Sequence, residues 1–242
     1  MPPKPRKPPP RPAGARNRNL LIAAAGAVAV VAVLVVVSIV VTGGGDNGST
    51  TTTGGSSALF AGIPQQGTTL GAPSAPVTLV QFEDMQCPVC REYQEDGFSG
   101  VVDEYVRPGK VKLRFAGLAF LGSDSEKALS HVLAAGKQGK LWQYVDALYT
   151  NQGAENSGWV TDELLERLAG DVGLDWARLQ QDAASTEVKR EAQASAAEAA
   201  HLQVPGTPSF FVQIGNGQPY HVQPNSFAID EFRTILDDAL GQ

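Results

Sequence analysis

Two cysteines, Cys87 and Cys90, are the residues whose type and spacing most directly indicate chemistry in this 242-residue sequence. They are the only cysteines of the chain, and they stand three positions apart. A structural zinc site built from cysteines usually needs four ligands, and the three histidines are scattered, so the sequence predicts no metal site. Exchange between a dithiol and a disulfide is chemistry that two such sulfur atoms can perform without a cofactor.

The surrounding sequence predicts that this pair lies between a strand and a helix. Residues 76–83 (PVTLVQFE) are rich in β-branched and bulky apolar side chains, which is typical of a buried strand. Pro88 suits the first turn of a following helix, where a missing N–H costs little. Free N–H groups and the helix dipole at such a position favour a thiolate. Cys87 is therefore the predicted nucleophile, and Cys90, one helical turn behind it, is the predicted resolving thiol.

A plain stabilising disulfide is the alternative interpretation of the two cysteines, and it is plausible outside the cell. The ring that they would close contains very few residues. Closing so small a ring removes little conformational entropy from the unfolded chain, and so it stabilises the fold little. The spacing therefore favours redox chemistry over a structural bond.

The elements that must position the pair follow an α/β order with a long helical stretch after the second strand. Trp142, Tyr144, Leu148 and Tyr149 in that stretch are interpreted as packing residues. After the strand at 76–83, we expect a strand at 110–116, helices at 125–136, 141–150, from 161, at 176–181 and at 185–202, a strand at 209–214, a returning strand from 220, and a closing helix at 229–240.

A second motif, residues 204–212 (VPGTPSFFV), directly precedes the predicted strand at 209–214. By itself this segment is typical of an ordinary turn. Together with Cys-Pro-Val-Cys after a strand, it makes residues 65–242 resemble the DsbA-like branch of the thioredoxin superfamily. The resemblance implies a thioredoxin-like fold with a helical domain inserted at about residues 120–200. It also implies that Pro208, preceded by Thr207, is cis and faces the cysteine pair.

The resemblance further implies that an extended substrate chain binds beside the pair, at a surface made by Pro88, Val89, Thr207 and Pro208. The sequence departs from the family pattern at Val89, where the best-known oxidases carry a histidine that stabilises the thiolate. A less oxidising pair is therefore expected.

A second departure concerns proton transfer. Related proteins often carry a buried glutamate six residues before the first cysteine, and Gln81, which cannot titrate, stands there. Glu83 and Asp84 are the candidates to transfer protons in its place. The alternative is that both are solvated acidic residues at the end of a strand.

The N-terminal part of the chain differs sharply in composition from the rest. Residues 1–19 carry six basic and no acidic side chains, so the net charge of −6 leaves −12 for the remainder. An acidic remainder argues against nucleic acid as a partner. Residues 20–41 contain no charge and would span roughly 33 Å as a helix, enough for a bilayer core of about 30 Å.

We therefore expect one transmembrane helix at 20–41, retained as a signal anchor. The alternatives are a cleaved signal peptide, whose apolar region is usually shorter, and a buried core helix. The positive-inside rule keeps residues 1–19 in the cytoplasm and places the rest outside. Residues 42–61, rich in Gly, Ser and Thr, predict a flexible linker, and residues 62–242 form the predicted catalytic domain.

These features together predict a membrane-anchored thiol–disulfide oxidoreductase that donates disulfides to cysteine-containing secreted or membrane proteins. The resemblance implies reoxidation by a membrane partner of the DsbB or vitamin K epoxide reductase type. Two alternatives remain open at this point. The same fold could work as a disulfide reductase or isomerase, or it could be a binding module without catalysis.

Overall fold

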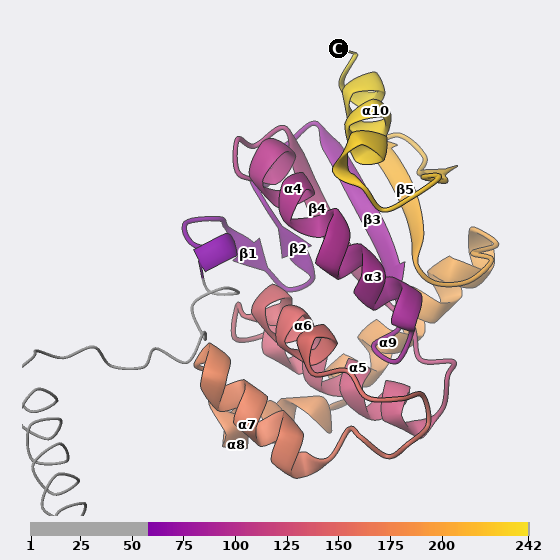
Figure 1. Ribbon diagram of the computed structural model, residues 1–242. Helices are drawn as coiled ribbons and strands as arrows, with labels where there is room; N and C mark the ends of the chain where they lie inside the picture. Colours follow the sequence, from indigo (N-terminus) through magenta and orange to yellow (C-terminus); the bar gives the residue numbers. More distant parts are fainter. Residues whose placement is uncertain (1–57, 242) are drawn as a thin grey trace, which may run out of the picture. The chain divides into compact units, whose positions relative to one another are not determined.

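A six-stranded sheet organises residues 58–241, the part of the chain that the computed structural model describes (Figure 1). Its strand order is β1-β2-β4-β3-β5-β6, and the central strands β3 and β4 are parallel, whereas their outer neighbours are antiparallel. The strands are β1 (Gln65–Gln66), β2 (Thr69–Leu70), β3 (Val77–Glu83), β4 (Val111–Gly117), β5 (Ser209–Ile214) and β6 (Tyr220–Val222).

Two sets of helices connect the strands. The first set joins β3 to β4 and consists of α3 (Pro88–Asp96), α4 (Phe98–Val101) and the π-helix η1 (Val102–Val106). The second set is the predicted helical insertion between β4 and β5: α5 (Ser123–Gly136), α6 (Leu141–Thr150), α7 (Asp162–Val172), α8 (Trp176–Ala183) and α9 (Thr186–His201). The last helix is α10 (Ile229–Leu240). The α/β order with a helical insertion is thus confirmed.

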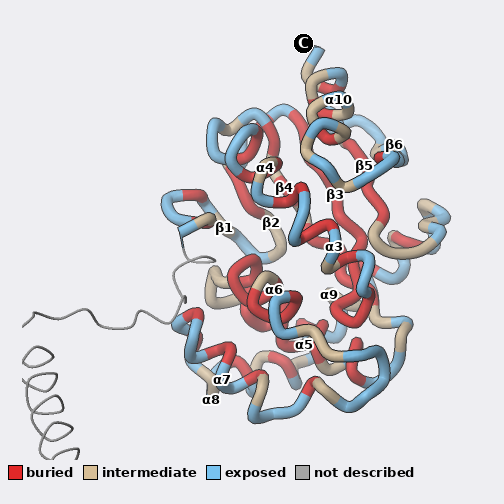
Figure 2. Tube along the Cα trace, in the orientation of Figure 1, coloured by how far each residue is buried: buried red, intermediate tan, exposed pale blue. Residues whose placement is uncertain are grey.

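Strand β3 is buried along its whole length because both faces of the sheet are covered. Alternate residues of a strand point to opposite faces, so Val77 and Leu79 join the large core that also contains residues of α3, α10 and the insertion. Val80 and Phe82 point the other way and form a smaller core with Ala199 of α9. Figure 2 shows the buried centre of the sheet and the largely exposed outer surface of the insertion.

Side-chain caps fix where helices of the insertion begin. The side chains of Thr161, Asp175 and Ser185 accept hydrogen bonds from backbone N–H groups at the starts of α7, α8 and α9. Helix α7 ends at Gly173, whose φ of 76° is a left-handed conformation that glycine adopts without strain. The Thr161 cap agrees with the helix start that the sequence predicts.

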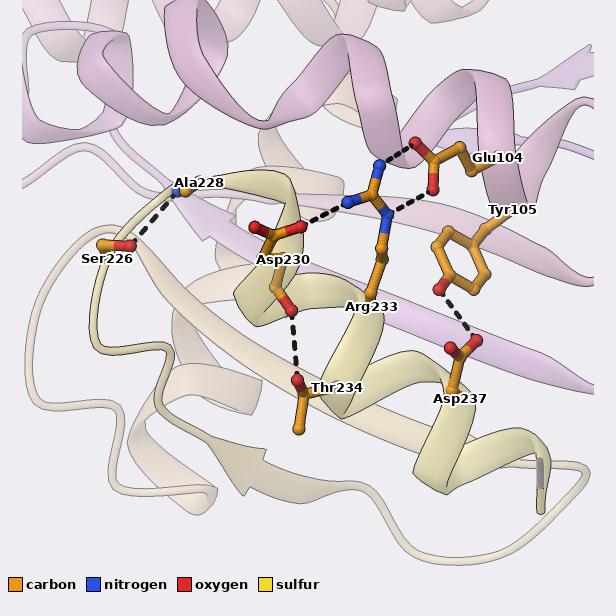
Figure 3. A network of polar contacts seen from close by, with 8 residues as sticks. All are labelled: Glu104, Tyr105, Ser226, Ala228, Asp230, Arg233, Thr234 and Asp237. Carbon is orange, nitrogen blue, oxygen red and sulfur yellow. Dashed lines mark hydrogen bonds and ion pairs between the residues drawn. The ribbon is translucent and has the colours of Figure 1, made fainter.

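The closing helix α10 is attached to η1 by polar contacts (Figure 3). The Arg233 guanidinium donates two hydrogen bonds to the Glu104 carboxylate, at 2.7 and 2.6 Å, and also pairs with Asp230. The Tyr105 hydroxyl donates to Asp237 at 2.8 Å. These contacts link the C-terminal helix to the segment that leads from α3 into β4.

Some elements were not predicted. The two-residue strands β1 and β2 and the short helices α4 and η1 have no clear sequence pattern. Several boundaries also differ slightly from the predictions: α5 begins two residues earlier, at Ser123, and α8 continues to Ala183. The core also reaches beyond the predicted start of the domain at residue 62, because Phe60 is buried against α4.

The predicted basic tail at 1–19, the transmembrane helix at 20–41 and most of the linker at 42–61 lie outside the described residues. Within residues 58–241, no helix has both the length and the apolar character needed to cross a bilayer.

Substitution of Gly97, between α3 and α4, tests how closely the segment before α10 approaches this junction. A Cβ atom at Gly97 would lie 2.1 Å from the carbonyl oxygen of Phe227, so the backbone would have to move. We expect Gly97→Ala to lower the free energy of unfolding by about 1–3 kcal/mol, measured by urea denaturation. Gly170→Ala in α7 is the control, because nothing lies within 4 Å and alanine should stabilise the helix by up to about 1 kcal/mol. Equal effects of the two substitutions would contradict this interpretation.

Candidate active site

The cysteine pair lies where β3 leads into α3, as the sequence predicts. Cys87 is the N-cap of α3, with an extended backbone, and Pro88 is the first residue of the helix. Both cysteines are free thiols, but they differ in access to solvent. Cys90 is fully buried, Cys87 is 7% exposed, and the intervening Val89 is 42% exposed. Solvent therefore approaches the pair from the side of Cys87.

The loop before β5 lies beside the cysteine pair, although it is far from the pair in the sequence. The Thr207–Pro208 peptide bond is cis, as the resemblance to DsbA-like proteins implies. The Cys87 thiol donates a hydrogen bond to the Thr207 carbonyl oxygen, at 3.3 Å, although 120 residues separate them. The Ser209 hydroxyl donates to the Gly206 carbonyl at 2.7 Å and closes the loop on itself. Thr207 and Pro208 are half-buried beside the reactive sulfur.

The pKa values of the two thiols are shifted in opposite directions. The pKa of Cys87 is lowered from 9.0 to about 6, chiefly by a hydrogen bond with the Cys90 thiol. The Thr207 side chain and the backbone N–H groups of Val89 and Cys90 also favour the thiolate, while burial opposes it. Burial is the main reason why the pKa of Cys90 is raised well above 9.0. Near neutral pH the site therefore holds a Cys87 thiolate and a protonated Cys90.

Glu83, one of the two candidates for proton transfer, is a buried carboxyl group that interacts with both cysteines. It is 1% exposed, and burial raises its pKa from 4.5 to about 8. The Tyr149 hydroxyl donates a hydrogen bond to it at 2.8 Å, which lowers this pKa, whereas the charge of Cys87 raises it. The charge of Glu83 in turn helps to raise the pKa of Cys90. Burial thus favours the protonated form of both Glu83 and Cys90 near neutral pH.

Asp84, the other candidate, is equally buried but is engaged elsewhere. Its carboxylate accepts hydrogen bonds from the backbone N–H groups of Gln86, Phe120 and Leu121, and from the Ser125 hydroxyl. These donors belong to the turn before Cys87, to the segment between β4 and α5 and to the first turn of α5. Asp84 therefore holds two loops together.

Gln81 stands where the resemblance to DsbA-like proteins implies a buried glutamate. It is fully buried, and its amide donates to the Tyr93 hydroxyl at 2.7 Å. Residues two apart on a strand point to the same face, so Gln81 and Glu83 share one face of β3. The buried carboxyl group of this chain therefore lies on the same face of β3 as Gln81, two residues closer in sequence to the cysteines.

Two residues of the site, one in the last turn of α6 and one just after this helix, were not predicted from the sequence. Tyr149 is buried packing, as predicted, but its hydroxyl also binds Glu83. The Gln152 amide donates to the carbonyl oxygens of Met85 and Cys87, at 2.8 and 3.1 Å. A buried carboxylate needs a hydrogen-bond donor, and a tyrosine in an apolar helix is a sequence signal for such a donor. This signal does not show which tyrosine binds the carboxylate, however, because Tyr144 of the same helix donates to a backbone carbonyl instead.

The site therefore combines a nucleophilic thiolate, a protonated thiol one turn behind it and a buried carboxyl group that can take or give a proton. This combination can perform thiol–disulfide exchange. Across residues 58–241, no three side chains of His, Cys, Asp and Glu are grouped as metal ligands would be.

Comparison with known proteins agrees with this chemistry. A family model described as Thioredoxin matches residues 64–238. The chain belongs to the thioredoxin family. A family relative from Bacillus anthracis, named "Probable disulfide bond formation protein D", is 32% identical over 158 residues, covering 64% of this chain and 72% of the relative. "Disulfide bond formation protein D" of Bacillus subtilis is 27% identical over 150 residues, covering 59% and 66% of the two chains.

Solved structures of the thioredoxin family show the same fold. Oxidised BdbD from Bacillus subtilis superposes with a TM-score of 0.63 at 23% identity, covering 74% of this chain and 98% of that one. A thioredoxin-like oxidoreductase from Silicibacter pomeroyi is 30% identical with a TM-score of 0.56, covering 77% and 98%. The thioredoxin-like fold with a helical insertion is confirmed, and this thioredoxin-family protein is a dithiol–disulfide oxidoreductase.

The acidity of Cys87 can be measured by its rate of alkylation with iodoacetamide as pH is varied. We expect one thiol to react, with a midpoint near pH 6, because only the thiolate is nucleophilic. In Cys90→Ala the midpoint should move to higher pH, since the largest cause of the lowered pKa is lost. An unchanged midpoint in this variant would show that the helix N-terminus and Thr207 alone account for the acidity.

The raised pKa of Glu83 predicts a pH-dependent loss of stability. The native state holds this proton up to about pH 8, whereas the unfolded chain releases it near pH 4.5, so stability falls as pH rises through this window. We expect Glu83→Gln to be more stable than wild type at pH 7, by roughly 2–3 kcal/mol, and about equally stable at pH 4. The difference between the two urea denaturation profiles isolates Glu83 from other titrating groups. A constant difference from pH 4 to 8 would contradict the raised pKa.

Proposed function

We propose that this protein donates disulfides to cysteine-containing secreted or membrane proteins through Cys87 and Cys90. The observation that carries the proposal is the stabilised thiolate of Cys87. Its pKa of about 6 lies one unit below pH 7, so ionisation favours the dithiol form about tenfold, or about 30 mV. A protein that is stabilised when reduced gives up its disulfide readily.

In the proposed reaction, a client thiolate attacks the Cys87 sulfur of the Cys87–Cys90 disulfide. The bond between the two cysteines breaks, and Cys90 leaves with the electron pair. Because its pKa is well above 9.0, Cys90 needs a proton at once, and protonated Glu83 supplies it. A second client thiolate then attacks the client sulfur of the mixed disulfide and releases Cys87 as a thiolate. The client gains one disulfide, and the pair is left as a dithiol.

Glu83 is the better candidate for this proton transfer than Asp84. Its carboxyl group has a pKa close to neutral, so it can both give and take a proton at working pH. The Asp84 carboxylate instead accepts four hydrogen bonds that hold the surrounding loops, and protonating it would weaken these bonds. We assign proton transfer to Glu83 and loop positioning to Asp84.

The client would bind as an extended chain over the surface beside Cys87. Pro88 and Val89 are exposed between the two cysteines, and Thr207 and Pro208 flank the sulfur from the other side. These four residues contribute mainly apolar side chains and backbone, with no charged group. Such a surface suits unfolded client segments of varied sequence.

We further propose that residues 20–41 anchor the protein in the cell membrane, with the catalytic domain outside the cytoplasm. The support is the uncharged 22-residue segment, the six basic residues before it and the flexible sequence after it. A membrane protein of the DsbB or vitamin K epoxide reductase type would reoxidise the pair. Tethering both proteins to one membrane would raise their effective concentration.

The direction of electron flow is tested by equilibrating the full chain with glutathione buffers and counting free thiols. We expect a reduction potential above about −200 mV, as disulfide donation requires. A potential near or below about −270 mV would indicate a reductase instead. If the pair did not exchange at all, a binding module would be the better interpretation.

Client transfer is tested by trapping. We expect Cys90→Ser, which cannot resolve a mixed disulfide, to accumulate covalent adducts with secreted or membrane proteins, seen on non-reducing gels. Cys87→Ser is the matched control and should trap none, because Cys90 is buried. Equal trapping by both variants would contradict the assignment of Cys87 as nucleophile.

A further inference from the structure

The end of α6 brings a hydroxyl group into the buried side of the redox site. The Tyr149 hydroxyl lies 2.8 Å from the Glu83 carboxylate and 3.3 Å from the Asp84 carbonyl oxygen, and it also contacts the Cys90 thiol. Tyr149 is 1% exposed, so its hydroxyl is shielded from bulk solvent. One group of the helical insertion thus touches both members of the proton-transferring pair.

We propose that Tyr149 is a positioning residue for proton transfer between Cys90 and Glu83, because its hydroxyl holds the Glu83 carboxylate beside Cys90 and stabilises its charge. This inference rests on the proposed role of Glu83. It makes the insertion, rather than the thioredoxin core alone, responsible for how readily the buried pair exchanges its proton.

The burial of Glu83 explains why one hydrogen bond matters here. A buried carboxylate costs free energy unless a cation or hydrogen-bond donors compensate for its lost hydration. None of the ion pairs among residues 58–241 includes Glu83. The compensation that the structure provides is the hydrogen bond from Tyr149, which favours the charged form of the carboxyl group.

The groups around Glu83 are otherwise neutral or negative. On β4 its neighbour is Gly117, and on β5 the pairing with β3 ends at Ser209; neither residue titrates. The titratable groups that face or adjoin it are Cys87, Cys90 and Tyr93 of α3, Tyr149 of α6 and the adjacent Asp84. Each of these disfavours a second negative charge when it is ionised. Only the neutral Tyr149 hydroxyl among them donates a hydrogen bond to the carboxylate.

The step in which Tyr149 matters most is the closure of the disulfide. In a mixed disulfide at Cys87, the Cys90 thiol passes its proton to the Glu83 carboxylate. The Cys90 thiolate attacks the Cys87 sulfur, the new disulfide forms, and the former partner leaves as a thiolate with the electron pair. Without the Tyr149 hydroxyl, Glu83 stays protonated to higher pH, so a smaller fraction of it is present as the carboxylate that accepts this proton.

The experiment uses Tyr149→Phe in the full chain. The reduced protein is mixed with excess oxidised glutathione, quenched with acid and analysed by mass, so that the limiting rate reports attack by Cys90 on the glutathione mixed disulfide. In wild type this rate should rise with pH as Glu83 ionises and then level off. In Tyr149→Phe we expect the midpoint to move up by about one pH unit and the rate at pH 7 to fall about tenfold.

Tyr144→Phe is the matched control. It removes the same hydroxyl from a buried tyrosine of the same helix, but that hydroxyl donates to the Leu165 carbonyl rather than to Glu83. We expect Tyr144→Phe to lower stability while leaving the midpoint of the rate profile at its wild-type value. A midpoint shift of the same size in both variants would show that Tyr149 acts only through the packing of α6 and would overturn the proposal.

Two further measurements separate this inference from the proposed function. The titration of Glu83, followed by ¹³C NMR of labelled glutamate, should shift upward in Tyr149→Phe whether the protein proves to be an oxidase or a reductase. An unshifted titration would overturn the inference alone. In a Glu83→Gln background, Tyr149→Phe should have no further effect on the rate profile, and an undiminished effect there would also overturn it. Failure of Cys90→Ser to trap clients would instead count against the proposed function.

Discussion

A carboxyl group buried beside two thiols, without a cation to neutralise it, is the constraint on which this active site depends. Glu83 and Cys90 are both removed from water, so charging both at once is unfavourable. The charge of Glu83 therefore raises the pKa of Cys90. Cys87, at the helix N-terminus, is the group that can be charged without this difficulty, because backbone N–H groups and the neighbouring thiol stabilise its thiolate. The opposite acidities of the two cysteines follow from this arrangement.

The helical insertion contributes to the active site as well as to the core. Tyr149 and Gln152, at the end of α6, reach Glu83 and the carbonyl groups around Cys87. On the other side, Asp84 binds the segment that leads into α5. The sheet supplies the carboxyl groups and the insertion supplies donors for them, so neither part would form this site alone.

Much of this fold could be predicted because its signals are local. The strand at 76–83, the cysteine motif and the helix start at Thr161 each depend on neighbouring residues. The strands β1 and β2, of two residues each, are too short to show a pattern. Strand β1 pairs with β2, and the pairing of β2 with β4 depends on residues about 45 positions away. The resemblance to DsbA-like proteins supplied the cis Pro208, which the turn sequence alone does not indicate.

The sequence alone does not distinguish the roles of Glu83 and Asp84 in the site. Both follow an apolar strand, and both could equally have been solvated. What separates them is the identity of their partners: backbone N–H groups for Asp84, and a tyrosine 66 residues away for Glu83. No local pattern specifies such a pairing, because it arises only when α6 packs against the start of α3.

The unequal burial of the two sulfur atoms also has a kinetic consequence. Cys90 is fully buried, so every covalent bond to another molecule must form at the sulfur of Cys87. The protein can hold a disulfide donor or a disulfide acceptor, but never both at the same time. Turnover must therefore alternate between two half-reactions, and steady-state rates should follow the parallel-line pattern of a ping-pong mechanism.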